Sequence, residues 1–200
     1  MNIDKTTHSL TKNNYYDLCH DKKQIVIGHS SFSDMKHLLG WKNRYNGTNK
    51  KTAMFSIDID GNIYQHFDPR YYSDFIGDKR EDIKTISIIL DNVGWLTKND
   101  NNEYITWNGD IYRNESNIKQ IKWRNYEFWV KYSDEQFNSL VFLTNKLILD
   151  FKIDREIVYH NTQITTDLGR PNVLYRSNLD KNNLDLNPTW DYIQFKKQVK

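Results

Sequence analysis

Short apolar runs along the chain predict buried β-strands. Residues 24–27 and 85–90 are continuous runs rich in β-branched residues, a pattern typical of strands that are covered on both faces. Residues 157–159 and 173–175 are shorter apolar runs, and we interpret each as a further short strand.

Two hairpins are predicted from alternation and turn residues. Residues 53–59 alternate apolar and polar side chains, and the Asp60-Gly61 pair that follows is a strong tight-turn signal. The return strand then begins at Ile63. A second, smaller hairpin is expected within residues 104–112, where the sequence reads YITWNGDIY.

Apolar positions at helical spacing predict helices at residues 34–45, 133–151 and 189–199. The middle helix has the clearest start, because Ser133 and Gln136 stand at the spacing of a capping box. The start and stop signals expected for the other helices are Ser33 or Asp34 (start), Gly47 (stop) and Pro188 (start), and the expected core positions of the first are Met35, Leu38, Leu39 and Trp41.

Strands that alternate with helices predict an α/β domain with a central mixed β-sheet flanked by helices. We expect a single domain over residues 23–200, preceded by a polar N-terminal arm over residues 1–22. Residues 94–132 carry four tryptophans but little regular pattern, and we expect this segment to be largely irregular.

The composition narrows the possible partners. A net charge of +2 is too small to favour nucleic acid or an anionic membrane surface, and no stretch approaches the length of a membrane span. Aromatic residues make up 14% of the chain, which fits either a groove that stacks on sugars, rings or peptides, or simply a well-filled core.

The cellular setting is suggested by the cysteine count and the first residues. Cys19 is the one cysteine, so no disulfide can form within the chain. The polar N-terminus lacks the apolar run of a signal peptide. We therefore expect a protein of the cytoplasm of an infected bacterial host, or one carried in a virion.

Three separated stretches carry a family resemblance: IVIGHSSF at residues 25–32, TAMFSIDIDGNIYQHF at residues 52–67 and LDLNPTWDY at residues 184–192. In this order and at these distances they resemble the zinc-dependent N-acetylmuramoyl-L-alanine amidases, which include phage amidase lysozymes and animal peptidoglycan recognition proteins. The resemblance extends over roughly residues 24–198 and implies the amidase fold. It also implies a zinc site that hydrolyses the bond between the lactyl group of muramic acid and L-alanine.

The resemblance places the metal ligands on residues that only partly suit zinc. In strict register the ligand positions are Gly28, Arg176 and Asp185, and an arginine cannot ligate a metal. His29, His160 and Asp185 form an alternative metal-binding set, if both histidines reach the site from the ends of their strands. Each histidine could equally be a hydrogen-bonded residue at a strand end. Zinc is thus a possible cofactor by resemblance, whereas the substitutions favour no metal.

The catalytic helper positions are also substituted. The glutamate, tyrosine and lysine of the family correspond to Ile89, Ala53 and Asn183. Arg176 and Asp185 are predicted to form an ion pair in the space that a metal would take. The resemblance implies that the ligand-binding cleft is lined by His29, Met54, His66, Tyr71, Tyr72, Phe75, Trp95, Tyr175, Arg176, Asn183 and Asp185.

Two functions follow from these expectations. The first is a phage-associated, degenerate amidase whose cleft binds a muropeptide or another small ligand without cutting it. The second is an active peptidoglycan amidase with an atypical zinc site. A third, a structural or partner-binding role, would use the tryptophan-rich residues 95–129. The oligomeric state is not indicated by the sequence.

Overall fold

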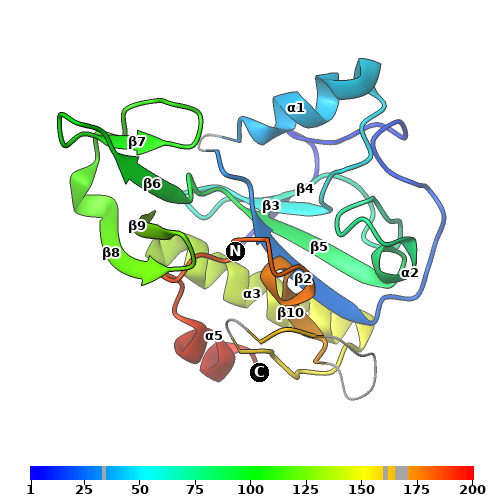
Figure 1. Ribbon diagram of the computed structural model, residues 1–200. Helices are drawn as coiled ribbons and strands as arrows, with labels where there is room; N and C mark the ends of the chain where they lie inside the picture. Colours follow the sequence, from blue (N-terminus) through cyan, green and yellow to red (C-terminus); the bar gives the residue numbers. More distant parts are fainter. Residues whose placement is uncertain (33–34, 160–161, 165–170) are drawn as a thin grey trace.

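Two β-sheets organise the chain (Figure 1). The computed structural model describes residues 1–32, 35–159, 162–164 and 171–200. Among these residues the larger sheet has six strands in the order β1-β4-β3-β5-β2-β10, and the smaller has four in the order β7-β6-β9-β8. The strands of the larger sheet are β1 (Ile3–Asp4), β2 (Gln24–His29), β3 (Phe55–Ile57), β4 (Ile63–Gln65), β5 (Thr85–Leu90) and β10 (Val173–Tyr175).

The middle of the larger sheet is formed by the apolar runs that predict buried strands. Every residue of β2 and β5 is buried, and the two strands pair in parallel. β3 and β4 form the predicted antiparallel hairpin, and Gly61 in its turn has a φ of +80°. Because β3 also pairs in parallel with β5, the sheet is mixed, as the sequence predicts.

Helix α3 (Asp134–Phe151) lies behind the larger sheet in Figure 1. Its predicted capping box is confirmed: Ser133 Oγ accepts from the Gln136 N–H at 3.0 Å, and Gln136 Oε1 accepts from the Ser133 N–H at 3.2 Å. The Gln136 amide also donates to the Asp91 carbonyl at 2.7 Å, which ties the helix to the end of β5. The short helix α4 (Arg176–Leu179) follows β10 directly and contacts β2.

The other helices differ from the sequence prediction at their ends. Helix α1 (His37–Asn43) is shorter than predicted and passes into the 3₁₀ segment η1 (Arg44–Gly47), while Ser33 and Asp34 lie outside the described residues. Helix α5 (Tyr192–Gln198) begins three residues late, because the cap is the Asp191 carboxylate, which accepts from the Gln194 N–H, and not a turn opened by Pro188. Leu39, expected in the core, is 64% exposed. The remaining short helices are α2 (Lys79–Asp82) and η2 (Glu115–Asn117).

The expectation of an irregular segment over residues 94–132 is wrong. The segment forms the smaller, antiparallel sheet, and the predicted hairpin within 104–112 is part of it. Few of its strand residues are buried, which explains why the apolar pattern is weak, although Trp129 is fully buried at its centre. The strands are β6 (Trp95–Lys98), β7 (Tyr104–Thr106), β8 (Ile118–Trp123) and β9 (Tyr126–Val130).

The ends of the chain also join the fold. Residues 1–22 contribute β1 and the buried residues Leu10, Asn14 and Lys22, so part of the polar lead-in packs on the sheet. The boundary between residues 22 and 23 stays a prediction. Of residues 157–159, expected to form a strand, only Ile157 pairs, in a single bridge to Val173. Within the described part of the chain, no helix has the length and apolarity needed to cross a membrane.

Candidate functional site

Polar side chains gather where the parallel strands of the larger sheet end. β2 ends at His29, Asp91 follows β5, and Arg176 follows β10. Because β10, β2 and β5 are parallel neighbours, their carboxyl ends lie at one edge of the sheet. In open α/β sheets this edge is the usual place for a ligand.

Asp185 joins two of these strand ends. Its Oδ1 atom lies 2.7 Å from Nδ1 of His29, and its Oδ2 atom accepts a hydrogen bond from Nε of Arg176. Nη2 of Arg176 donates to the main-chain carbonyl of His29 at 3.0 Å. The ion pair predicted between Arg176 and Asp185 is therefore confirmed.

Gly28 makes room for this ion pair. A Cβ atom at this position would lie 2.6 Å from Arg176 Nε and 2.8 Å from Asp185 Oδ2, which is closer than real Cβ contacts. A side chain at position 28 would thus point at the guanidinium and the carboxylate. Gly28, Arg176 and Asp185 converge on one small volume, which is where the family resemblance puts three metal ligands.

The charge of Asp185 is held in a buried place. Burial alone would favour its neutral form, but Arg176 and then His29 outweigh that effect and hold the pKa of Asp185 well below its usual range. The guanidinium is fixed from a further direction by Phe75, whose ring centroid lies 4.9 Å from Arg176 Cζ. The arginine is therefore oriented before any ligand arrives.

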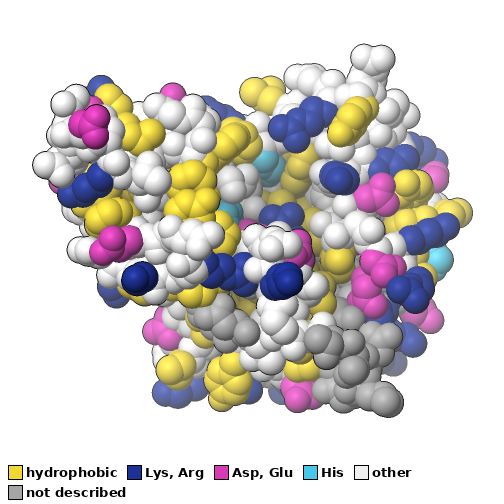
Figure 2. All heavy atoms as spheres, in the orientation of Figure 1, with side chains coloured by type: hydrophobic (Ala, Val, Ile, Leu, Met, Phe, Trp, Pro, Cys, Tyr) yellow, Lys and Arg dark blue, Asp and Glu magenta, His cyan; other side chains and the backbone are white. Residues whose placement is uncertain are grey.

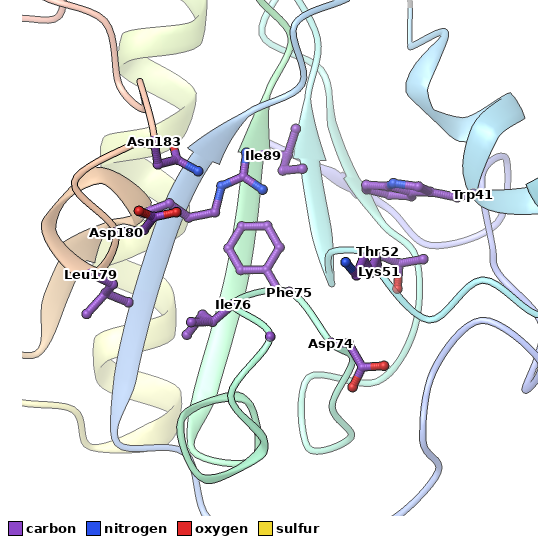
Figure 3. A pocket seen from close by; sticks show the side chains of 12 residues that line it. Trp41, Lys51, Thr52, Asp74, Phe75, Ile76, Ile89, Leu179, Asp180 and Asn183 are labelled. Carbon is purple, nitrogen blue, oxygen red and sulfur yellow. The ribbon is translucent and has the colours of Figure 1, made fainter. Parts of the chain in front are cut away.

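Above the ion pair lies a cleft of about 360 Å³ (Figure 3). In the close-up, Asn183, Asp180 and Leu179 lie on one side of Phe75, while Trp41, Lys51 and Thr52 lie on the other. In Figure 2 the surface is hollowed between the lobe of the smaller sheet and the side that carries α1. The lining residues are Trp41, Lys51, Thr52, Asp74, Phe75, Ile76, Gly77, Ile89, Arg176, Leu179, Asp180 and Asn183.

The structure brings some of the predicted ligand-binding residues together at this cleft and leaves others away from it. Phe75, Arg176 and Asn183 line the cleft, and His29 and Asp185 lie beneath Arg176. The other predicted ligand-binding residues do not line the cleft, because their side chains pack against other parts of the protein. Met54, His66, Tyr72 and Tyr175 are almost fully buried, Tyr71 stacks on Tyr15, and Trp95 stacks on Tyr126 in the smaller sheet.

His66 belongs instead to a buried polar chain. Its Nδ1 atom lies 2.8 Å from the His8 carbonyl, and its Nε2 atom lies 2.6 Å from Ser56 Oγ. Burial lowers the pKa of His66 to about 3, so its neutral ring donates to His8 and accepts from Ser56. Ser56 also lies 3.2 Å from Nε2 of His37, whose Nδ1 atom is 3.0 Å from Asp91 Oδ1. None of the residues of this polar chain lines the cleft.

Several cleft residues escape sequence reasoning. Lys51, Asp74 and Asp180 lie in loops without a motif, and only folding brings them to one place. The helical spacing of Trp41 in the sequence predicts a core residue and not a cleft residue. Its ring packs edge-on against His37 and His66 and also reaches the cleft wall.

Of the three residues that stand at the helper positions, Ile89 and Asn183 line the cleft and Ala53 does not. Ile89 is paired with Gly28 across β5 and β2, and it lines the cleft. An isoleucine has no proton to give or take, so this position supplies only an apolar wall. Ala53 is fully buried and does not reach the cleft.

The residues at this site do not fit a zinc ion. The donor set at the three strict positions has no side chain at Gly28 and a guanidinium at Arg176. Of the predicted set, His29 and Asp185 contact one another, and His160 lies outside the described residues. Over residues 1–32, 35–159, 162–164 and 171–200, no three His, Cys, Asp or Glu side chains form a group that could hold a metal.

The mixed sheet and the helices packed on it define the fold of this protein. It has the α/β fold of the N-acetylmuramoyl-L-alanine amidases, as the sequence resemblance predicts. No protein-family model matches the chain, and no curated protein matches it at a significant level.

Solved structures carry the comparison. A mutant endolysin from Bacillus subtilis matches with a TM-score of 0.57 at 13% identity, over 100% of this chain and 99% of that one. The N-acetylmuramoyl-L-alanine amidase LysC from Clostridium intestinale matches with a TM-score of 0.57 at 11% identity, over 100% of this chain and 97% of that one. The amidase AmiD from E. coli was solved with anhydro-N-acetylmuramic acid-L-Ala-D-gamma-Glu-L-Lys. It matches with a TM-score of 0.59 at 14% identity, over 96% of this chain and 65% of that one. At these identities the likeness is one of fold.

Proposed function

We propose that this protein is a degenerate amidase-fold protein that binds a muropeptide or another small ligand in the cleft above Arg176 and does not hydrolyse it. The observation that carries the proposal is the ion pair of Arg176 with Asp185. It fills the volume on which positions 28, 176 and 185 converge. A site with a guanidinium there lacks the Lewis acid that the amidase reaction requires.

The acid–base chemistry supports the same proposal. Asp185 is buried and already engaged by His29 and Arg176, so it is poorly placed to take a proton from water. Ile89 offers no proton transfer at the helper position beside Gly28. The cleft keeps an aromatic and polar lining, with Trp41, Phe75 and Asn183, of the kind that suits a small ligand.

The setting is part of the proposal. Endolysins are among the structural relatives, as is an amidase solved with a muropeptide. We propose that this protein is likewise phage-associated and acts in the infected bacterial cell or from the virion. We also extend to it a muropeptide as the first ligand to test.

Two measurements test the proposal. Zymography on purified cell walls should give no clearing, and the melting temperature of the protein should rise with a muropeptide and stay unchanged when a chelator is added. Clearing of the cell wall that stops with the chelator would overturn the proposal. That result would favour an active amidase with an atypical zinc site, for which the contact of His29 with Asp185 is the supporting observation.

A further inference from the structure

We propose that the cleft recognises its ligand through a carboxylate, which Arg176 binds from the floor with Asn183 and Lys51 beside it. This inference rests on the proposed binding function and names the chemistry of the ligand.

Arg176 has hydrogen-bond donors left over. Nε is taken by Asp185 and Nη2 by the His29 carbonyl, both on the buried side of the guanidinium. Nη1 has no acceptor among the described residues, and 25% of the side chain is exposed where it lines the cleft. A guanidinium can only donate, and its fork matches the two oxygens of a carboxylate.

The geometry of Arg176 is fixed in advance. The carboxylate of Asp185, the carbonyl of His29 and the ring of Phe75 hold the guanidinium from three directions. A group that is already oriented loses little conformational entropy when a ligand binds. Asp185 also contacts His29 Nδ1 at 2.7 Å, so Arg176 is one of two groups that interact with its negative charge.

Two more donors face the same space. Asn183 accepts the Asp185 N–H at 3.0 Å through Oδ1, which leaves the Nδ2 end of its amide to donate. Lys51 is exposed, lines the opposite wall, and has no ion-pair partner within the described ranges. Asn183 and Lys51 thus place donors on opposite walls of the cleft, on either side of Phe75 (Figure 3).

The acidic residues of the cleft restrict the charge of the ligand. Asp74 and Asp180 balance Lys51 and Arg176, so the described residues of the lining carry no net positive charge. Asp74 accepts from the Tyr16 hydroxyl at 3.2 Å, and Asp180 accepts from the Asn182 N–H at 2.8 Å. A single carboxylate suits this balance better than a phosphate dianion, and the acidic rim suits an amine on the same molecule. A short peptide with a free carboxylate has both groups.

The experiment compares three probes by isothermal titration calorimetry. The tripeptide L-Ala-D-gamma-Glu-L-Lys should bind, its fully amidated form should bind roughly tenfold to a hundredfold more weakly, and inorganic phosphate should not compete. Equal affinity for acid and amide, or no binding of any probe, would overturn the inference. Competition by phosphate would also overturn the choice of a carboxylate.

Two variants separate recognition from folding. Lys51→Gln is exposed and should fold normally, yet bind the tripeptide roughly tenfold more weakly. The double variant Arg176→Gln/Asp185→Asn removes both buried charges together, so neither is left unpaired, and it should lose the preference for acid over amide. Lys197→Gln, on the exposed face of α5, is the matched control and should bind as the parent does. Equal affinity of acid and amide would leave the proposed function standing, whereas hydrolysis of cell walls would overturn the proposed function itself.

Discussion

The side chain of Arg176 lies in the space that a side chain on Gly28 would need: a Cβ atom on residue 28 would lie 2.6 Å from Nε of Arg176. The position of the Arg176 guanidinium therefore requires a residue without a side chain at position 28. The two residues lie 148 positions apart in the chain and meet because β2 and β10 are parallel neighbours in the sheet.

The first prediction tests the close approach itself. Gly28→Ala should lower the free energy of unfolding by about 1–3 kcal/mol, because the added methyl group forces the buried ion pair apart. Gly40→Ala is the matched control, since its nearest atom is Arg44 Nε at 3.4 Å and the position is helical. The control should be neutral or slightly stabilising. Urea unfolding measures both, and equal effects at the two glycines would contradict the packing at position 28.

The second prediction concerns the ion pair. Arg176→Met should destabilise the fold by roughly 3–5 kcal/mol, because among the described residues it leaves the carboxylate of the buried Asp185 with His29 alone as a partner. The exposed pair of Arg70 with Asp68 is the comparison, with side chains 62% and 32% exposed. Arg70→Met should change the stability little, because solvent screens the exposed pair. A small effect at Arg176 in thermal or urea unfolding would mean that the ion pair is not the support described.

The third prediction uses the convergence of positions 28, 176 and 185. Gly28→His and Arg176→His made together should create a zinc site with Asp185, since the three side chains point at one volume and form a set that zinc accepts. Metal analysis should find stoichiometric zinc in the double variant, and zinc should raise its melting temperature. Gly28→His alone should destabilise the protein, because Arg176 still fills the space. A folded double variant without zinc would refute the convergence.

The fourth prediction is a pH dependence. Burial lowers the pKa of His66 from 6.5 to about 3, so between these values the unfolded chain binds a proton that the folded protein does not. Stability should therefore fall as the pH drops from about 6.5 toward 3, with this histidine contributing up to about 1.4 kcal/mol per pH unit. His66→Gln keeps a donor and an acceptor but cannot titrate. It should show a shallower slope in urea unfolding between pH 4 and 6.5, and an unchanged slope would contradict the assignment.

The fifth prediction concerns the start of α3. Ser133→Ala should destabilise the protein by about 1–2 kcal/mol, because the hydroxyl both caps the helix through the Gln136 N–H and donates to the Ile59 carbonyl at 2.6 Å. Ser116→Ala, in the exposed segment η2, should change stability by less than about 0.5 kcal/mol. The Ser116 hydroxyl donates to the Asn114 side chain two residues away, so similar melting temperatures of the two variants would speak against the cap.

Features that depend on a few neighbouring residues could be predicted from the sequence. The Asp60-Gly61 turn, the capping box at Ser133 and the apolar run at residues 85–90 each act within a few residues, and each is where the sequence predicts it. The smaller sheet was missed because most of its strand residues stay partly exposed, which removes the apolar alternation that marks a strand. The start of α5 was predicted three residues too early because Pro188 favours a helix start, whereas the Asp191 carboxylate caps the helix.

The sequence by itself determined the fold class and the pairing of Arg176 with Asp185, because substituted positions within a family resemblance can be read one at a time. Only the tertiary structure decided which side chains reach the cleft. Met54, His66 and Tyr175 turn into the interior, whereas Lys51 and Asp180 come to the cleft from distant loops. The reason is physical: side-chain direction along a strand is local, but the walls of a cleft are set by contacts between segments far apart in the chain.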